Sequence, residues 1–348
     1  MSLLRLCLIA TVVCQNIASS VSTSHAAETI NIVSLVPGEG QLRDKFMRTE
    51  KKLERRFGGD TDVILLIDGQ VGTEESMIAT VRRGRAQLAM LSTPGTSAAI
   101  SELSLLMAPF LFDSFEEADF VLDNYVTDMV EQLFADKGLH FIQWIDSGWF
   151  NIFARQPIRI PADIKNLRMR AAGGPAARIF LQEAGADVAQ LPFADLVPGL
   201  QTGLLSGGAT NTPMYRTVAL YELAPYITMT RHGINPGAIF ANKAWFDRLS
   251  PERQVIVAEG ISPTSILRAD VRREGLEAIE FSAGRGATII ELTLAERALW
   301  KAATTQSHEM LIEEIGGKAR DLFNLIQDGK SAFAASTTLG AEPRDASR

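Results

Sequence analysis

The chain has 348 residues and a formal net charge of −7 at pH 7; 46% of its residues are hydrophobic and 22% are charged. A chain of this length exceeds one average hydrophobic core, so the length predicts two domains. The composition is that of a globular protein. The acidic balance argues against nucleic acid and against an anionic membrane surface as partners.

Residues 1–27 have the pattern of a secretory signal peptide. Arg5 is followed by an apolar run that ends at Cys14, and a polar stretch then leads to the small residues Ala26 and Ala27. The run is shorter than the roughly 20 apolar residues of a membrane-spanning helix. The pattern therefore predicts export to the periplasm, with cleavage after Ala26 or Ala27.

Both cysteines, Cys7 and Cys14, lie in this leader segment. The mature chain therefore has no thiol for a disulfide, a nucleophile or a metal site, and we expect neither a cofactor nor a metal. Lipid attachment at Cys14 is the competing interpretation, although the preceding residue is Val13 rather than a small Gly or Ala.

After the leader, strand and helix patterns alternate, which is typical of an α/β fold with a mostly parallel sheet flanked by helices. Apolar runs predict strands over residues 29–36, 63–67 and 87–91. Helical periodicity predicts helices from about residue 41 to 57, over 74–83, and in two pieces over 115–137. The turn Pro37-Gly38-Glu39-Gly40 could hold an anion on its backbone N–H groups, and a plain tight turn is the competing interpretation.

Two extended stretches, residues 140–154 and 226–240, are longer than the average strand of five or six residues. Two crossings of the chain between two lobes would explain both. The expected boundaries are lobe one over residues 28–147 and 237–280, lobe two over 148–236, and a C-terminal part over 281–348. We expect a cleft with a hinge between the lobes. The C-terminal part should form a strand at 288–292, helices that pack across the lobes, and a disordered tail.

Arg168 and Arg170 alternate with Leu167 and Met169 in a predicted strand, so both arginines project from the same face. A guanidinium donates two parallel hydrogen bonds to a planar carboxylate and stays charged when partly desolvated. These residues alone leave two interpretations equally open, a carboxylate clamp and a pair of solvated edge arginines. Gly207-Gly208, further along, is expected to form a turn, and a close approach of its backbone to a ligand is the competing interpretation.

Catalytic signatures are scarce. The mature chain keeps His140, His232 and His308 with no short spacing between them, and none of the common hydrolase, metalloprotease or phosphate-loop motifs occurs. His140 and His308 are expected to be structural or solvated. His232 lies in the second extended stretch and could line a cleft, although a structural role is the favoured interpretation.

Five segments carry a family resemblance: residues 77–91, 103–123, 157–170, 183–208 and 240–257. They include a Pro-Phe segment, a P-x-D-x-K-x-L-x-x-R segment and an Asn-Lys-x-Trp segment before Leu-x-Pro-x-x-Gln. Together they resemble the solute receptors of TRAP (tripartite ATP-independent periplasmic) transporters, of the DctP type, over nearly all of the mature sequence. The resemblance implies a two-lobed periplasmic binding protein of the type II-like class, with mixed sheets and hinge strands.

The resemblance also assigns residues. In that family the arginine that closes the K-x-L-x-x-R segment holds the ligand carboxylate, and this position is Arg170. A ligand-contacting aromatic lies 23 residues later, at Phe193. The family asparagine maps onto Thr210, with Asn211 adjacent. The implied partners are a small organic acid and the membrane subunits of a TRAP permease, and the receptor is expected to be a monomer.

The sequence departs from the family pattern at three places. The usual D-G-x-E-N segment reads Ser206-Gly207-Gly208-Ala209-Thr210, so both carboxylates are missing. A second arginine of sialic-acid-type members is replaced by Phe150, beside Trp149, and a glutamate at the end of the third strand by Ser92. These differences predict a less charged, more aromatic cleft that takes a smaller or more apolar acid than a sugar acid.

The resemblance favours a receptor that captures a carboxylate by hinge closure and delivers it to a permease. A sensor or orphan binding protein on the same scaffold is the alternative. An exported hydrolase or isomerase is less favoured, because no histidine–carboxylate or serine–histidine arrangement stands out, and we expect the protein not to be an enzyme.

Overall fold

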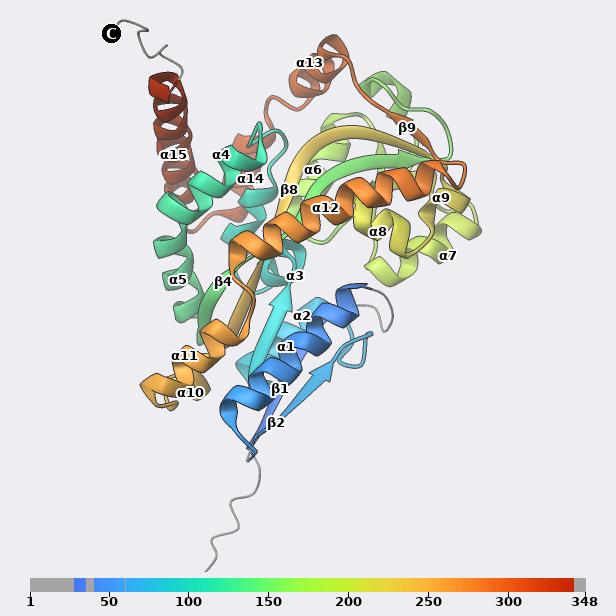
Figure 1. Cartoon of the computed structure of the whole chain (residues 1–348). Helices are drawn as coiled ribbons and strands as arrows, with labels where there is room; N and C mark the ends of the chain where they lie inside the picture. The colour runs from blue at the N-terminus through green and yellow to red at the C-terminus, as the bar shows by residue number, and fades with distance from the viewer. Residues whose placement is uncertain (1–27, 36–40, 60, 341–348) are drawn as a thin grey trace, which may run out of the picture.

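Two long antiparallel strands, β4 (Leu139–Ala154) and β8 (Tyr226–Asn242), organise the fold. They lie at the centre of a nine-stranded mixed sheet in the computed structural model, which describes residues 28–35, 41–59 and 61–340. The strand order is β2-β1-β3-β8-β4-β7-β5-β6, and β9 pairs with β8 outside this path. In Figure 1 these two long strands run from the region of β1–β3 to the region of β9.

The remaining strands are β1 (Glu28–Ser34), β2 (Thr61–Leu66), β3 (Leu88–Leu91), β5 (Arg168–Ala171), β6 (Asp187–Gln190), β7 (Gly207–Thr210) and β9 (Thr288–Ile290). The α-helices are α1 (Gln41–Phe57), α2 (Glu74–Arg82), α3 (Thr93–Ser97), α4 (Phe115–Val121), α5 (Thr127–Asp136), α6 (Pro175–Glu183), α7 (Leu196–Gln201), α8 (Thr212–Thr217), α9 (Leu220–Leu223), α10 (Lys243–Phe246), α11 (Pro251–Gly260), α12 (Thr264–Ala283), α13 (Leu294–Ala303), α14 (Ser307–Ile315) and α15 (Ala319–Gly340). Short turns of other helix types are η1 (Ser101–Met107), η2 (Leu122–Val126), η3 (Pro161–Ile164) and η4 (Phe193–Asp195).

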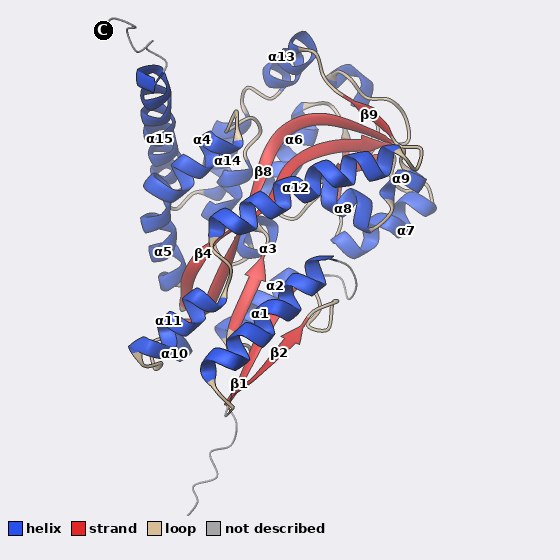
Figure 2. Ribbon diagram, in the orientation of Figure 1, coloured by secondary structure: helices blue, strands red, loops and turns tan. Residues whose placement is uncertain are grey.

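Each long strand has different neighbours in its two halves. The end of β8 pairs with β3, whereas the end of β4 pairs with β7, so each half of the sheet is completed by a separate set of strands. Between Asp146 and Trp149 the pairing of β4 with β8 shifts register, and Gly148 adopts a φ of 82°. A bulge of this kind bends a strand locally. β4 and β8 therefore connect the two halves of a two-lobed α/β fold, and Figure 2 shows both strands in red.

The expected strands and helices of the first 137 residues are confirmed where the structure describes them, with ends that differ by one or two residues. The two extended stretches are β4 and β8. The leader, the 37–40 turn and the tail from 341 onward lie outside the described residues. No helix among the described residues is long and apolar enough to cross a membrane.

The expected turn at Gly207-Gly208 is wrong, because both residues belong to β7 in the middle of the sheet. β7 lies between β4 and β5. A Cβ on Gly207 would overlap the carbonyl oxygen of Phe153, and a Cβ on Gly208 would lie 3.0 Å from the Phe153 ring. The glycines are therefore required by close strand packing rather than by a turn.

The C-terminal helices pack on both parts of the molecule, as expected. α14 contacts α6 on one side and η1 on the other, and α15 lies along α4 and η2 (Figure 1). α12, which the expected boundaries place in lobe one, runs along β4 as far as α8 and β9. It therefore contacts both halves of the sheet, and the exact lobe boundaries remain a prediction.

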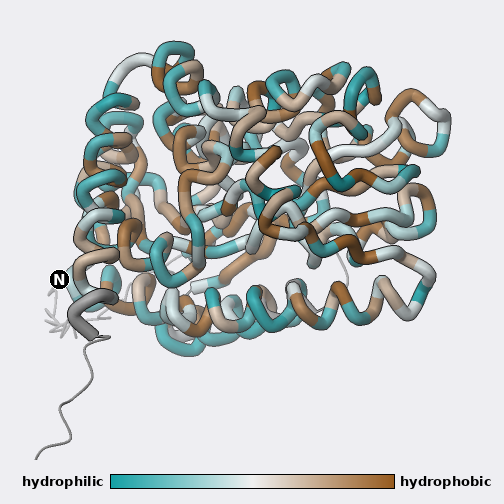
Figure 3. Tube along the Cα trace, turned by 90° about the horizontal axis from the view of Figure 1, so that it is seen from above, coloured by the Kyte–Doolittle hydropathy of each residue, from teal (hydrophilic) through white to brown (hydrophobic). Residues whose placement is uncertain are grey.

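Buried apolar side chains form separate clusters rather than one core. The largest joins α2, η1, α4 and α5 to the middle of β8, and two others lie around β7–α9 and around β5–α6. Figure 3 shows teal and brown segments alternating along the outer helices, which is the pattern of helices with one buried face. The largest cluster also includes Ala176 and Ile179 of α6 and Ala209 of β7, so it joins the two halves of the sheet.

Candidate functional site

A cavity of about 810 Å³ lies between elements of the two halves of the sheet, within the range of 300–1,000 Å³ typical of ligand pockets. Its wall includes the ends of β3, β5, β6 and β7, the bulge of β4, the start of α2 and one side of α12. Six of the seven expected site residues line it: Ser92, Phe150, Arg170, Phe193, Thr210 and Asn211.

Arg170 is held rigidly in the cavity wall. The residue is 5% exposed, its Nε donates to the Leu191 carbonyl oxygen at 3.0 Å, and its Cζ lies 5.5 Å from the centroid of the Phe193 ring. Within the described residues its guanidinium makes this one hydrogen bond and no ion pair. Burial lowers the pKa of Arg170 to about 10, against a smaller raising effect of Asp195, so the group stays cationic at neutral pH.

Arg168, two residues earlier, differs from Arg170 in every respect that matters for binding. Its side chain is 48% exposed and forms an ion pair of 3.0 Å with Asp187 on the neighbouring strand β6. A solvated pair of this kind contributes little to stability. The structure therefore makes Arg168 the solvent-facing member of the pair.

Thr210 ends β7 and Asn211 follows it as the N-cap of α8, and both residues are buried. The Oδ1 of Asn211 accepts a hydrogen bond from the Met214 amide at 2.9 Å, so this side chain caps α8 while lining the cavity. Its amide nitrogen has no hydrogen bond to a described residue. A neutral donor is thus fixed close to the strand that carries Arg170, because β7 pairs with β5.

Trp149 does not line the cavity, which corrects the expected aromatic wall. Its ring packs 5.1 Å from the ring of Phe115. Neighbouring residues on a strand point to opposite faces, so Phe150 and Trp149 cannot both face the ligand. Phe150 and Phe193 are the aromatic residues of the expected set that remain in the wall.

Ser92 lines the cavity, but its hydroxyl is already used. Its Oγ and backbone N donate to the two carboxylate oxygens of Glu74, at 2.6 and 2.7 Å. The expected role of Ser92 as a donor to the ligand is therefore replaced by the positioning of Glu74.

The cavity is more acidic than the sequence comparison predicted. Its described lining contains the carboxylates of Glu74, Glu75, Asp146 and Glu274. Glu74 lies outside the segments that carry the family resemblance, so the resemblance assigns it no role. The order of the elements could have predicted its position. α2 follows β2 in a parallel unit, so the first residues of α2 lie at the edge of the sheet where β3 ends.

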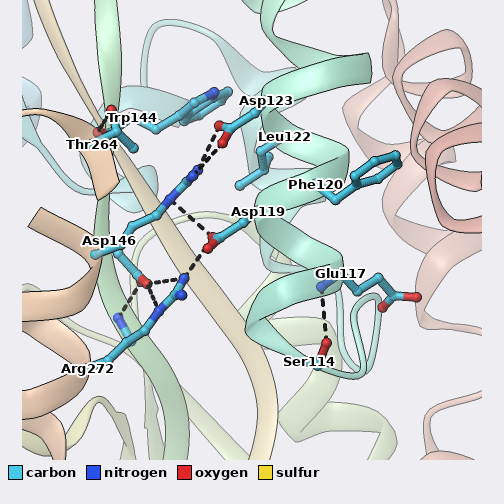
Figure 4. A network of polar contacts seen from close by, with 12 residues as sticks. Ser114, Glu117, Asp119, Phe120, Leu122, Asp123, Trp144, Asp146, Thr264 and Arg272 are labelled. Atoms are coloured by element: carbon cyan, nitrogen blue, oxygen red, sulfur yellow. Dashed lines mark hydrogen bonds and ion pairs between the residues drawn. The ribbon is translucent and has the colours of Figure 1, made fainter. Parts of the chain in front are cut away.

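Asp146 connects the cavity to a network of ion pairs behind it (Figure 4). Its carboxylate accepts from the Gly148 amide at 2.7 Å and pairs with Arg272 of α12 at 3.2 Å. Arg272 also pairs with Asp119 of α4 at 2.7 Å, and Arg268, one turn earlier, pairs with Asp119 at 3.1 Å. Burial raises the pKa of Asp146, against lowering by the Gly148 amide and Arg272.

His232 is a core residue rather than a cleft residue. It lines a small separate space behind Phe150, its ring stacks on Phe180 at 4.0 Å, and its Nδ1 lies 2.7 Å from the hydroxyl of Thr230. Burial, with a smaller effect of Arg297, lowers the pKa of His232 to about 3, so the ring is neutral. His140 stacks on Phe246 and His308 bonds the Pro109 carbonyl, so both are structural as expected.

The sequence profile of bacterial extracellular solute-binding protein family 7 matches residues 41–314. The chain belongs to this family. As a family 7 protein it is a TRAP-type solute-binding protein rather than an enzyme, and its family is extracytoplasmic.

Individual relatives agree with this membership. The chain is 26% identical over 278 residues to the 2,3-diketo-L-gulonate-binding periplasmic protein of Escherichia coli (strain K12), covering 79% of this chain and 84% of that protein. A TRAP periplasmic solute-binding protein of Roseobacter denitrificans with bound β-D-glucuronate superposes with a TM-score of 0.80 at 22% identity, covering 86% and 99% of the two chains. The periplasmic ectoine-binding protein of a TRAP transporter of Halomonas elongata gives 0.81 at 22% identity, covering 88% and 100%.

Proposed function

We propose that this family 7 protein captures a small organic carboxylate through Arg170 and delivers it to the membrane subunits of a TRAP transporter. The observation that carries the proposal is a buried guanidinium that lines a cavity of ligand size and has no ion-pair partner among the described residues. A buried unpaired charge is unfavourable, so an anionic ligand group is the natural partner.

The other wall residues complete the carboxylate site. Phe193 and Phe150 bound the space beside Arg170 and keep water from it, which strengthens the ion pair. Thr210 and the free amide of Asn211 supply neutral hydrogen bonds from β7. The relatives named above take 2,3-diketo-L-gulonate, β-D-glucuronate and ectoine, each of which carries one carboxylate.

Binding is coupled to closure of the two lobes. β4 and β8 are the connections that bend, and the register shift between Asp146 and Trp149, beside the cavity, is one of three in their pairing. A ligand that contacts both sides of the cavity favours the closed form, which is the form the permease recognises. The protein acts in the periplasm as a monomer, after removal of the leader.

A thermal-shift screen of the mature protein against an organic-acid library tests this function. A ligand that binds only the folded state adds about 2.7 kcal/mol at a hundredfold excess over its Kd. Small-angle scattering with the best ligand should give a smaller radius of gyration. A screen in which no carboxylate binds, or in which Arg170→Ala binds as tightly as the native protein, would reject the proposed site.

A further inference from the structure

A second charged group is fixed in the wall of the same cavity. Glu74, the first residue of α2, accepts hydrogen bonds from the Ser92 backbone N and Oγ at 2.7 and 2.6 Å. Within the described residues no Lys, Arg or His forms an ion pair with this carboxylate. Glu74 is therefore an anion that the protein positions but does not neutralise.

The position of the Glu74 carboxylate depends on a glycine. A Cβ on Gly95 would lie 2.8 Å from the Glu74 Cδ, so no other residue at this place would leave the carboxylate where it is. Gly95 follows Ser92 in α3, and its backbone N donates to the Ser92 Oγ at 3.4 Å. The two donors of Ser92 and the absence of a side chain at Gly95 thus fix the position of the Glu74 carboxylate.

The remaining charges of the cavity do not compensate for Glu74. Asp146 is paired with Arg272, and Glu75 is an exposed second carboxylate next in the chain. Arg170 is the one cation among the residues that line the described cavity, against four carboxylates. A ligand with a second negative charge would be repelled by this wall, since like charges in a partly desolvated site are costly.

Glu74 and Arg170 belong to opposite sides of one space. The loop after β5 brings Gly173 close to the start of α2, since a Cβ on Gly173 would lie 3.7 Å from the Glu75 Oε1 and 3.8 Å from the Pro94 Cβ. Pro94 precedes Gly95, against which the Glu74 carboxylate packs. The end of β5, which carries Arg170, therefore lies near the starts of α2 and α3, where Glu74 is held.

From this juxtaposition we propose that the ligand is a zwitterion, whose carboxylate pairs with Arg170 and whose protonated nitrogen pairs with Glu74. The inference rests on the proposed function, because it assigns the second half of the same ligand. A nitrogen cation neutralises Glu74 and gains a charge-assisted hydrogen bond, whereas an apolar group would leave the carboxylate unpaired. Glu74 is then the residue that selects among carboxylates.

Matched probes test the inference. Three pairs differ only in a protonated nitrogen: pipecolate with cyclohexanecarboxylate, proline with cyclopentanecarboxylate, and 5-aminopentanoate with hexanoate. Glucuronate serves as a hydroxyl-rich acid without nitrogen. Calorimetry should find at least one zwitterion that binds about tenfold more tightly than its nitrogen-free partner, which corresponds to 1.4 kcal/mol. Equal or tighter binding of the nitrogen-free partners, or a glucuronate that binds more tightly than every zwitterion, would overturn the inference.

Two variants separate this inference from the function on which it rests. Glu74→Gln keeps the shape of the side chain and should reduce the preference for the zwitterion over its nitrogen-free partner to less than about threefold. Glu74→Asp, which keeps the charge but shortens the side chain, is the second variant and should retain part of the preference. Arg170→Ala should weaken both members of each pair. If the nitrogen-free acids bind the native protein and Glu74→Gln does not change the binding of the zwitterions, the proposed function stands and the inference is rejected. If none of the probes binds, both are rejected.

Discussion

Arg170 and Gly208 face each other across the parallel strands β5 and β7, and a Cβ on Gly208 would lie 3.3 Å from the Cβ of Arg170. The same carbon would lie 3.1 Å from the Arg170 carbonyl oxygen. The missing side chain of Gly208 therefore sets the distance between β5, which holds the Arg170 cation, and β7, which ends at Thr210 and is followed by Asn211.

The first prediction concerns this glycine. Gly208→Ala should destabilise the protein by about 1–3 kcal/mol, because the new methyl group overpacks a closely packed sheet. It should also weaken carboxylate binding, since Arg170 must shift. Gly59→Ala is the control, because a Cβ at Gly59 meets no atom within 4 Å. Denaturant melts and calorimetry measure the two effects; a Gly208→Ala protein that matches Gly59→Ala in both would contradict the packing argument.

The second prediction concerns the geometry of the cation. Arg170→Lys keeps the charge but loses the planar fork of donors, so binding should weaken at least about tenfold, or 1.4 kcal/mol. Arg170→Ala should be worse, because it removes the cation from the described lining. Arg168→Ala should stay close to the native affinity, since Arg168 is solvated and paired with Asp187. A larger loss of affinity for Arg168→Ala than for Arg170→Ala would mean that Arg170 is not the arginine that binds the anion.

The third prediction concerns the network behind the cavity. Arg272→Met removes the partner that Asp146 and Asp119 share; Asp119 keeps its pair with Arg268, but Asp146 is left as a buried carboxylate without an ion pair, so the change should cost about 1–3 kcal/mol. Lys243→Met breaks the exposed pair with Asp247 and should cost less than about 0.5 kcal/mol. Equilibrium urea unfolding compares the two. Equal and small losses would show that the network contributes no more than a surface pair.

The fourth prediction is a pH dependence that arises from His232. The unfolded ring takes up a proton below its ordinary pKa of 6.5, whereas the buried ring resists protonation until about pH 3. His232 therefore stabilises the fold above pH 6.5, and this contribution is lost as the pH falls toward 3. His232→Gln should be less stable than the native protein at pH 7.5, and the deficit should shrink at pH 4.5. A constant deficit across this range, measured by urea unfolding, would argue against a neutral buried histidine.

The fifth prediction concerns Glu74 without any ligand. Burial raises the pKa of this carboxyl group above its ordinary value of 4.5, against lowering by the two bonds from Ser92. The folded protein therefore binds the proton more tightly than the unfolded chain, so Glu74 destabilises the fold increasingly as the pH rises above 4.5. Glu74→Gln should raise the Tm of the ligand-free protein at pH 7.5 more than at pH 4. A lower Tm at pH 7.5 would mean that the Ser92 bonds outweigh the burial of the charge.

Most of the fold could be predicted from periodicity. β4 and β8 were expected because their extended patterns exceed an average strand. Arg170 was assigned by the family resemblance, since the strand pattern alone left a carboxylate clamp and a pair of solvated arginines equally open. β7 could not be predicted in this way. Its Gly207-Gly208 pair has the local signal of a turn, and only the packing of β4 and β5 on both sides makes it a strand.

The carboxylate of Glu74 in the cavity wall could not be predicted from the sequence for a different reason. Glu74 and Ser92 are separated in sequence and meet because α2 and α3 begin at the same edge of a parallel sheet. Trp149 was assigned to the wall through its neighbour Phe150, although strand geometry sends the two side chains to opposite faces. Side-chain direction and the pairing of distant residues are tertiary properties, which a linear pattern does not contain.

The path of β8 has a consequence for how the protein is made. β3 and β4 both take β8 as their partner, and β8 ends at Asn242, about 150 residues after β3 in the chain. Neither half of the sheet is complete until that strand has emerged, so contacts of long sequence separation must form late and folding is slow. A chain that reaches only as far as β7 therefore exposes unpaired strand edges on both halves, and such edges are prone to aggregation until β8 is available to pair with them.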